Sequence, residues 1–158
     1  MLGSLLAVAV RAQLKAAPTS PASTGQEGDR MRTSIHQEID FKASPQRLYD
    51  ALLDSKLFSA FTGEAAQIDR QAGGAFSMFE GKIVGRNIEL VADERIVQAW
   101  RPANWRAGVY SIVKFELKKR GTEARVVLDH TGFPQGAFAD LDAGWKIRYW
   151  NPLEKFVA

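Results

Sequence analysis

The sequence predicts an α+β fold, in which a curved antiparallel sheet of about six or seven strands wraps around a long C-terminal helix and carries two short helices. Three observations lead to this prediction. Period-two alternation runs through the middle of the chain, turn residues and not helices separate its segments, and the last quarter changes to helical spacing. Strands joined by short turns form an antiparallel meander. The 158 residues, 46% of them apolar, suffice for one domain with a sizeable core.

The first strand is predicted over residues 35–41, and two short helices follow it. Apolar and polar side chains alternate along this strand, with Ile35, Ile39 and Phe41 on one face and His36, Glu38 and Asp40 on the other. Ser44-Pro45 then gives a helix N-cap followed by proline at the first helical position. A second helix from Asp54 ends at Thr62-Gly63, since glycine readily adopts the left-handed backbone of a helix end.

Five further strands are predicted between residues 75 and 131. They span residues 75–79, 82–91, 94–100, 108–118 and 123–131, with turns at Gly73-Gly74, Glu80-Gly81 and Gly121. The longest places Val109, Ser111, Val113, Phe115 and Leu117 on one face. In the last strand His130 shares a face with Val126 and Leu128, so we expect this imidazole to point into the core.

The C-terminal segment has helical spacing of large side chains. Residues three or four apart form the apolar stripe: Phe138, Leu141, Trp145, Tyr149, Leu153 and Phe156. Trp150 and Val157 widen this stripe to roughly half the helix circumference. So broad an apolar arc favours a helix gripped by a concave sheet over a helix on a flat sheet. Pro152 lacks an amide donor and is predicted to kink the helix or loosen its last turn.

Specific motifs resemble a known family. These are GAFSMFEG at 74–81, RIVQAWR at 95–101, Trp105 with Tyr110-Ser111, and Gly144-Trp145 with Tyr149-Trp150. They resemble the C-terminal domain of the activator of heat shock protein 90 ATPase and its single-domain bacterial homologues, from about Thr33 to Val157. The resemblance implies the helix-grip fold of the START and Bet v 1 superfamily. It also implies an internal cavity for apolar ligands and, for the co-chaperone, contact with a chaperone.

The predicted domain organisation is a helix-grip domain over residues 31–158 preceded by an N-terminal extension over residues 1–30. Leu2 to Val10 is apolar, and Arg11 and Lys15 lie in an acid-free stretch. This extension has three interpretations: a disordered segment, a targeting peptide for an organelle or export, or a functional arm. We expect a cytoplasmic protein, with targeting by the extension left open. No apolar run reaches the ~20 residues that span a bilayer.

Composition excludes several function classes. The absence of cysteine excludes a disulfide framework, a thiolate nucleophile and a cysteine-based zinc site. A formal net charge of +3 is too small to argue for nucleic acid. No second histidine stands at metal-ligand spacing, and no cofactor fingerprint is present, so we expect neither a metal nor a cofactor. No Gly-x-Ser-x-Gly motif occurs, and Asp129 points away from His130 because neighbours along a strand face opposite ways.

The remaining signal is a set of large side chains predicted to meet between sheet and helix. The cavity candidates are Phe76, Met78, Trp100, Trp105, Tyr110, Phe115, His130, Phe133, Trp145 and Tyr149. They favour a noncatalytic domain that binds a small hydrophobic or aromatic ligand. The first alternative is a co-chaperone-like module whose convex sheet or Trp105 loop contacts a chaperone. The second is a cyclase- or hydrolase-like enzyme using His130. For His130 the other interpretation is a buried, hydrogen-bonded imidazole.

Overall fold

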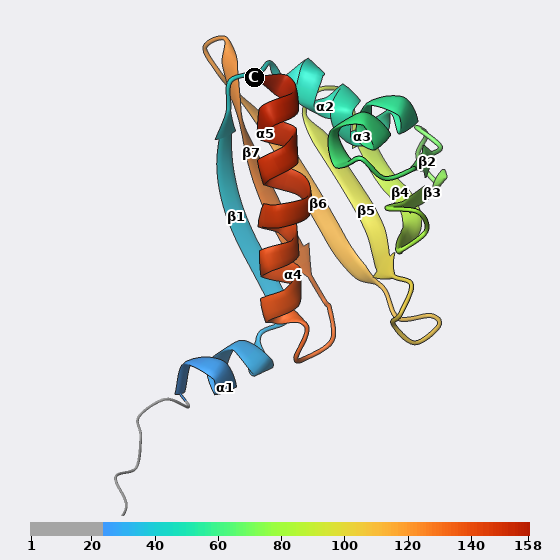
Figure 1. Cartoon of the computed structure of the whole chain (residues 1–158), viewed down its shortest axis with the longest axis vertical. Coiled ribbons are helices and arrows are strands. Elements are labelled where there is room, and N and C mark those ends of the chain that lie inside the picture. Colours follow the sequence, from blue (N-terminus) through green and yellow to red (C-terminus); the bar gives the residue numbers. More distant parts are fainter. Residues whose placement is uncertain (1–23) are drawn as a thin grey trace, which may run out of the picture.

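The computed structural model describes residues 24–158, which form one antiparallel sheet, the helices that cover its concave face and a short N-terminal helix beyond one end (Figure 1). The seven strands are β1 Ser34–Phe41, β2 Gln67–Ile68, β3 Ala75–Met78, β4 Ile83–Val91, β5 Arg95–Pro102, β6 Ser111–Arg120 and β7 Glu123–Thr131. Their order across the sheet is β1-β7-β6-β5-β4-β3-β2. The predicted α+β fold with a curved antiparallel sheet is therefore confirmed.

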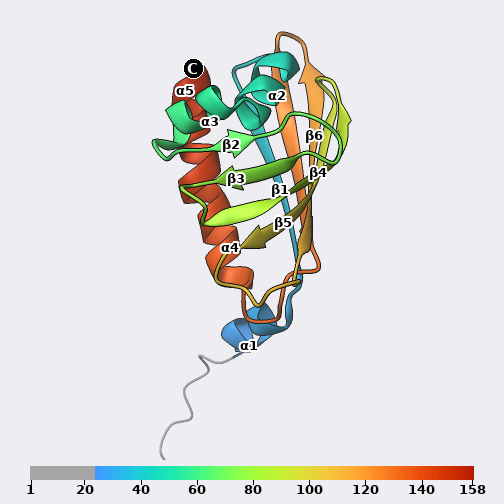
Figure 2. The same cartoon turned by 90° about the vertical axis from the view of Figure 1, so that its right-hand side faces the viewer.

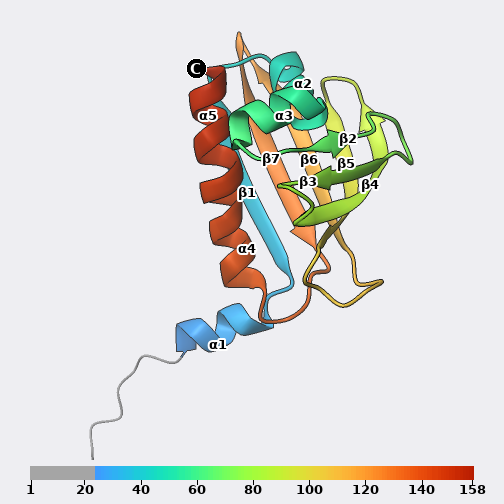
Figure 3. The same ribbon diagram turned by 45° about the vertical axis from the view of Figure 1, so that its right-hand side comes forward.

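Figures 2 and 3 show how strongly this sheet bends: β1, β6 and β7 run along the long axis of the domain, whereas β2, β3 and β4 turn across it. Gly85 makes the close approach of β4 to its neighbours sterically feasible. A Cβ on Gly85 would lie 1.9 Å from the carbonyl oxygen of Ala99 on β5 and 2.5 Å from the Phe76 ring. Because no side chain fits there, glycine is required at this bend.

Both short helices begin where the sequence predicts, and the second also ends at the predicted residue. Helix α2 spans Pro45–Leu53, and the Ser44 hydroxyl accepts a hydrogen bond from the Arg47 amide at its N-terminus. Helix α3 spans Ser55–Thr62 and ends at Gly63, whose φ of 74° is left-handed. These helices close one end of the concave face, with Leu48, Leu53 and Phe58 fully buried.

The C-terminal helix contains a wide turn that the sequence did not predict. Helix α4 (Phe138–Gly144) is followed by the π-helical turn η1 (Trp145–Trp150) and by α5 (Asn151–Val157). The Asn151 amide donates to the Lys146 carbonyl, five residues back. Pro152 was predicted to kink the helix or loosen its last turn, but α5 is regular, and the irregular turn precedes the proline.

Two further differences concern the ends of predicted elements. Strand β3 ends at Met78, one residue early, because the left-handed backbone already begins at Phe79 (φ 52°) and continues through Glu80 (φ 56°). Such a conformation costs about 1–3 kcal/mol at a non-glycine residue. Burial of the Phe79 ring against Phe58 and Tyr149 offsets that strain. In addition, strand β6 starts at Ser111, so Val109 lies in the preceding loop.

Only the last part of the predicted N-terminal extension falls on described residues. Residues 24–30 of this extension form helix α1 (Thr24–Met31) together with Met31, while residues 1–23 lie outside the described part. The Arg30 carbonyl accepts a hydrogen bond from the Gly136 amide, and the Arg32 guanidinium lies 4.8 Å from the Phe138 ring centre. Helix α1 therefore contacts the start of the C-terminal helix. Across residues 24–158, no helix combines the length and apolarity needed to cross a membrane.

Candidate functional site

An open pocket lies where the sheet, the β5–β6 loop and the start of the C-terminal helix meet. Its volume is about 240 Å³. Its wall includes the rings of Phe79, Trp100, Trp105, Trp145 and Tyr149, and three polar side chains also line it: Asn104, Asp140 and Arg148. The arrangement is that of a small-molecule site, which is mostly apolar with a few polar groups.

A stack of indoles begins in the inner wall of the pocket and continues into the core. The rings of Trp100 and Trp145 are stacked with centres 5.7 Å apart, and Trp145 is stacked in turn on Trp150 at 5.6 Å. Trp145 and Trp150 stand five residues apart, so the wide turn η1 brings them onto one face of the helix. Trp105 stands edge-on against Trp100 at 6.4 Å and closes the stack toward the loop.

Arg101 fixes the loop that carries Trp105. Its Nη1 donates to the Trp105 carbonyl oxygen at 3.0 Å, and its guanidinium lies 5.8 Å from the Tyr110 ring centre. The Trp105 amide donates to the Pro102 carbonyl at 3.0 Å. The loop is thus held at both sides of Trp105, while Tyr110 remains 48% exposed on the surface.

A buried hydrogen-bond chain supports the stack from behind. The Trp145 indole N–H donates to His130 Nδ1 at 3.0 Å. Because the indole only donates, Nδ1 is the acceptor nitrogen, and the proton of the neutral imidazole resides on Nε2. That N–H donates to the Ser111 hydroxyl at 2.7 Å, and the hydroxyl donates to the Trp100 carbonyl at 3.0 Å. Every polar atom of the His130 side chain is therefore engaged.

Burial keeps His130 neutral. The side chain is fully buried, and this desolvation lowers its pKa from 6.5 to about 3. A general base that works near neutral pH needs a pKa near the operating pH and access to its substrate. His130 has both nitrogens occupied, so the geometry does not favour the cyclase- or hydrolase-like hypothesis.

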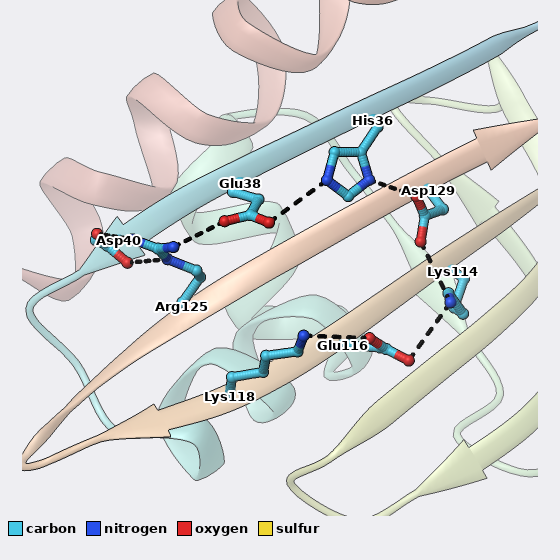
Figure 4. Close-up of polar contacts among 8 residues, drawn as sticks. All are labelled: His36, Glu38, Asp40, Lys114, Glu116, Lys118, Arg125 and Asp129. Atoms are coloured by element: carbon cyan, nitrogen blue, oxygen red, sulfur yellow. Dashed lines mark hydrogen bonds and ion pairs between the residues drawn. The ribbon is translucent and has the colours of Figure 1, made fainter.

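The opposite face of the sheet carries a network of charges in place of rings (Figure 4). Arg125 on β7 donates to both oxygens of Asp40 at 2.7 and 2.8 Å and to Glu38 at 2.7 Å, both on β1. Asp129 contacts His36 Nδ1 at 2.6 Å and Lys114 Nζ at 3.2 Å. The ion pairs continue to Glu116 and Lys118 on β6. These exposed charges largely satisfy one another.

The structure divides the predicted cavity residues into three groups. Four of them line the pocket: Trp100, Trp105, Trp145 and Tyr149. Five are buried in the core away from its lining: Phe76, Met78, Phe115, His130 and Phe133. Tyr110 lies on the surface. Alternation along the strands correctly gave the inward face of Phe115 and His130, but it does not specify how far a residue lies from the pocket.

Several pocket residues were missed by sequence reasoning. Phe79 lies in a turn, and Arg148 and Asp140 lie on the polar side of the helical stripe. Of these three residues, only Arg148 could have been expected in the pocket from the sequence, because it lies one helical turn after Trp145 and next to Tyr149. No group of three His, Cys, Asp or Glu side chains capable of holding a metal occurs within residues 24–158.

The fold and the site define a helix-grip domain, in which a bent antiparallel sheet holds a C-terminal helix and leaves a pocket at one end. The chain belongs to the Activator of Hsp90 ATPase homolog 1-like protein family, whose model matches residues 42–158. The family resemblance expected from the sequence is thereby confirmed.

Relatives of known sequence agree with this assignment. An activator of 90 kDa heat shock protein ATPase homolog from Dictyostelium discoideum is 34% identical over 108 residues, which cover 68% of this chain and 28% of that protein. Homolog 1 from Homo sapiens is 26% identical over 115 residues, 73% of this chain and 34% of that protein. An uncharacterized Schizosaccharomyces pombe protein, C1711.08, is 29% identical over 145 residues, 89% of this chain and 43% of that protein. The chain thus spans well under two thirds of these relatives.

Solved structures share the fold. An HSP90 activator from Plasmodium falciparum superimposes with a TM-score of 0.75 at 24% identity, over 78% of this chain and 95% of that one. The Aha1 dimer from Colwellia psychrerythraea gives a TM-score of 0.68 at 15% identity, over 80% and 96% of the two chains. At these identities the likeness concerns the fold alone.

Proposed function

We propose that this domain is a noncatalytic binding module whose pocket holds a small hydrophobic or aromatic ligand. The observation that carries the proposal is the meeting of Trp100, Trp105, Trp145 and Tyr149 around an opening of about 240 Å³. Rings that line a concave site supply apolar contact area, and the polar rim supplies orientation. The binding unit is the predicted domain of residues 31–158, with residues 1–30 as an extension to it.

Gly144 offers a way to close the pocket without disturbing the fold. It lines the pocket in a helical conformation, and a Cβ added there meets no atom within 4 Å. We expect Gly144→Leu to fold and to fill the pocket. Ala143→Leu adds the same side chain at an exposed neighbouring position outside the pocket lining, so it is the matched control.

The experiment titrates the purified full chain with 1-anilinonaphthalene-8-sulfonate and with naphthalene, monitored by tryptophan fluorescence. Wild type and Ala143→Leu should bind alike, and Gly144→Leu should lose roughly tenfold in affinity, which corresponds to about 1.4 kcal/mol of lost apolar contact. Binding at background level in the wild type, or equal binding in both variants, would overturn the proposal. Extraction of the protein as purified then identifies any ligand that it carries.

A second candidate function is contact with a chaperone of the 90 kDa heat shock class. The names of the Dictyostelium and human relatives, both activators of its ATPase, favour this candidate. The β5–β6 loop is the surface to test, because Tyr110 on it is an exposed aromatic side chain. Stimulation of the chaperone ATPase from the same organism should fall in Tyr110→Ala and persist in Gly144→Leu. An absence of stimulation at micromolar wild-type protein would count against this candidate.

A further inference from the structure

The first part of the C-terminal helix is a weakly secured part of the pocket wall. Helix α4 contributes Asp140, Leu141 and Gly144 to the pocket lining. All seven of its residues remain partly or fully exposed, and Ala137 at the N-cap position has no polar side chain to bond the first amides. A helix with few buried contacts opens readily. Contacts from neighbouring segments therefore matter for the position of this helix.

The chain between α1 and β1 holds both ends of the loop in front of α4. The Gly136 amide donates to the Arg30 carbonyl, and the Gly132 amide donates to the Thr33 carbonyl, both at 2.9 Å. The Arg30 carbonyl belongs to the last turn of α1, where carbonyls lack partners within the helix. Figures 1 and 3 show α1 directly beyond the first turn of α4. The two bonds therefore fix the loop relative to the end of α1.

A third contact reaches α4 itself. The Arg32 guanidinium lies 4.8 Å from the centre of the Phe138 ring, in the first turn of α4. The face of an aromatic ring attracts a cation at this distance. Asp29 in α1 lies 3.7 Å from the same guanidinium and so restrains it. Neither Arg32 nor Phe138 lines the pocket, so these two residues act on its wall only through helix α4.

We propose that helix α1 and the residues that follow it act as a strut for the pocket, with Arg32 as a positioning residue. They hold the first turn of α4 in place, and thereby keep Leu141 and its neighbours where an apolar ligand contacts them. This inference rests on the proposed binding function, and it makes the described end of the N-terminal extension a functional arm. Because the strut acts without ligand, its effect on α4 is measured separately from binding.

The first experiment measures the affinity of the full chain for naphthalene by tryptophan fluorescence. Naphthalene is uncharged, so the charge of Arg32 has no direct effect on its binding. Arg32→Gln removes the cation above Phe138 and should weaken binding about threefold, the value of one exposed cation–π contact. Arg32→Lys keeps a cation and should bind almost as well as wild type. Arg30→Gln, the matched control, changes an exposed side chain of α1 but not its carbonyl, and should bind like wild type.

A double-mutant cycle tests whether the effect passes through the Phe138 ring. Phe138→Leu removes the ring at a position outside the pocket lining, and leucine favours a helix. In this background Arg32→Gln should cause no further loss of affinity. Additive losses from the two substitutions would overturn the role of Arg32 as a positioning residue.

Hydrogen exchange tests the strut in the absence of ligand. The Leu141 amide donates to the Ala137 carbonyl and the Trp145 amide to the Leu141 carbonyl, so both amides report on the opening of α4. In Arg32→Gln they should exchange about threefold faster, while the amides of β7 keep their wild-type rates. Equal exchange in Arg32→Gln and wild type would overturn the strut and leave the binding function standing.

The two measurements together separate the strut from the binding function. Faster exchange in Arg32→Gln with an unchanged affinity for naphthalene would overturn the link between α1 and the pocket. If the wild type does not bind naphthalene, the binding function fails, and the claim that α1 sets the affinity of the pocket fails with it.

Discussion

The two histidines stand on paired strands yet have opposite environments. In the pairing of β1 with β7, His36 lies opposite Asp129 and Ile35 lies opposite His130, so the histidines point to opposite faces of the sheet. The His36 side chain is 59% exposed between the carboxylates of Asp129 and Glu38, and their contacts raise its pKa. Full burial lowers the pKa of His130 to about 3.

This difference shows that the face of the sheet determines the protonation and the hydrogen-bond partners of each imidazole. On the outer face, His36 is one of several exposed charges that solvent screens. On the inner face, neutral His130 has a fixed tautomer that orients Trp145 in the pocket wall. The inner histidine therefore shapes the candidate site, whereas the outer one belongs to the exposed charge network.

The largest expected effect is that of His130→Phe on stability. Phenylalanine fills similar space but leaves the buried Trp145 N–H without an acceptor and removes the donor to Ser111. We expect the free energy of unfolding to fall by about 2–3 kcal/mol, measured by urea denaturation at pH 7. His36→Phe is the matched substitution on the outer face and should shift the midpoint only slightly. Equal losses in the two variants would contradict the contrast between the faces.

The pH dependence of stability should carry opposite signs for the two histidines. His130 has a pKa lower in the folded than in the unfolded chain, so its contribution is complete above pH 6.5 and is lost as the pH falls toward about 3. Each unit in that interval removes up to about 1.4 kcal/mol. His36 has a raised pKa in the folded chain, so its contribution is present below pH 6.5 and is lost as the pH rises through that higher value.

Urea unfolding measured from pH 4.5 to 8 separates these contributions. His130→Gln should flatten the acid side of the stability profile, and His36→Gln should flatten the side above pH 6.5. An acid side that stays as steep in His130→Gln as in the wild type would show that carboxylates, and not the buried imidazole, cause the loss.

Much of the inner face was predictable from the sequence because alternation along a strand has a strict period of two. That rule placed His130 beside Val126 and Leu128, and all three are buried. The cap at Ser44 and the left-handed Gly63 were equally predictable, because each depends on local backbone chemistry.

The pocket itself was only partly predictable. A pocket is the space that remains after all side chains have packed, so no single residue in the sequence specifies it. The π-helical turn η1 illustrates this limit. A stripe at helical spacing does not anticipate that Trp145 and Trp150 stack at a separation of five residues. Two contacts stabilise this turn: the indoles of Trp145 and Trp150 stack together against the sheet, and the Trp150 N–H donates a hydrogen bond to Gln37 on β1. Tertiary contacts of this kind override local periodicity.

The smallest expected effect, and the sharpest test of screening, is that of Arg125→Gln on the outer face. Arg125 joins Asp40 and Glu38 in the charged network, and a Debye length of about 3 Å at 1 M salt weakens such exposed pairs. We expect a slight fall in the thermal midpoint at low salt that disappears at 1 M sodium chloride.

Gln37→Leu is the inner-face counterpart of this substitution. Gln37 accepts the Trp150 N–H at 2.6 Å and donates to Asp142 at 2.7 Å, and the bond to the buried indole is not screened by salt. Its loss of stability should therefore be the same at low salt and at 1 M sodium chloride. If Arg125→Gln lowered the thermal midpoint equally at low and at high salt, the outer charges would stabilise the fold without screening by salt. The proposed contrast between the two faces of the sheet would then be wrong.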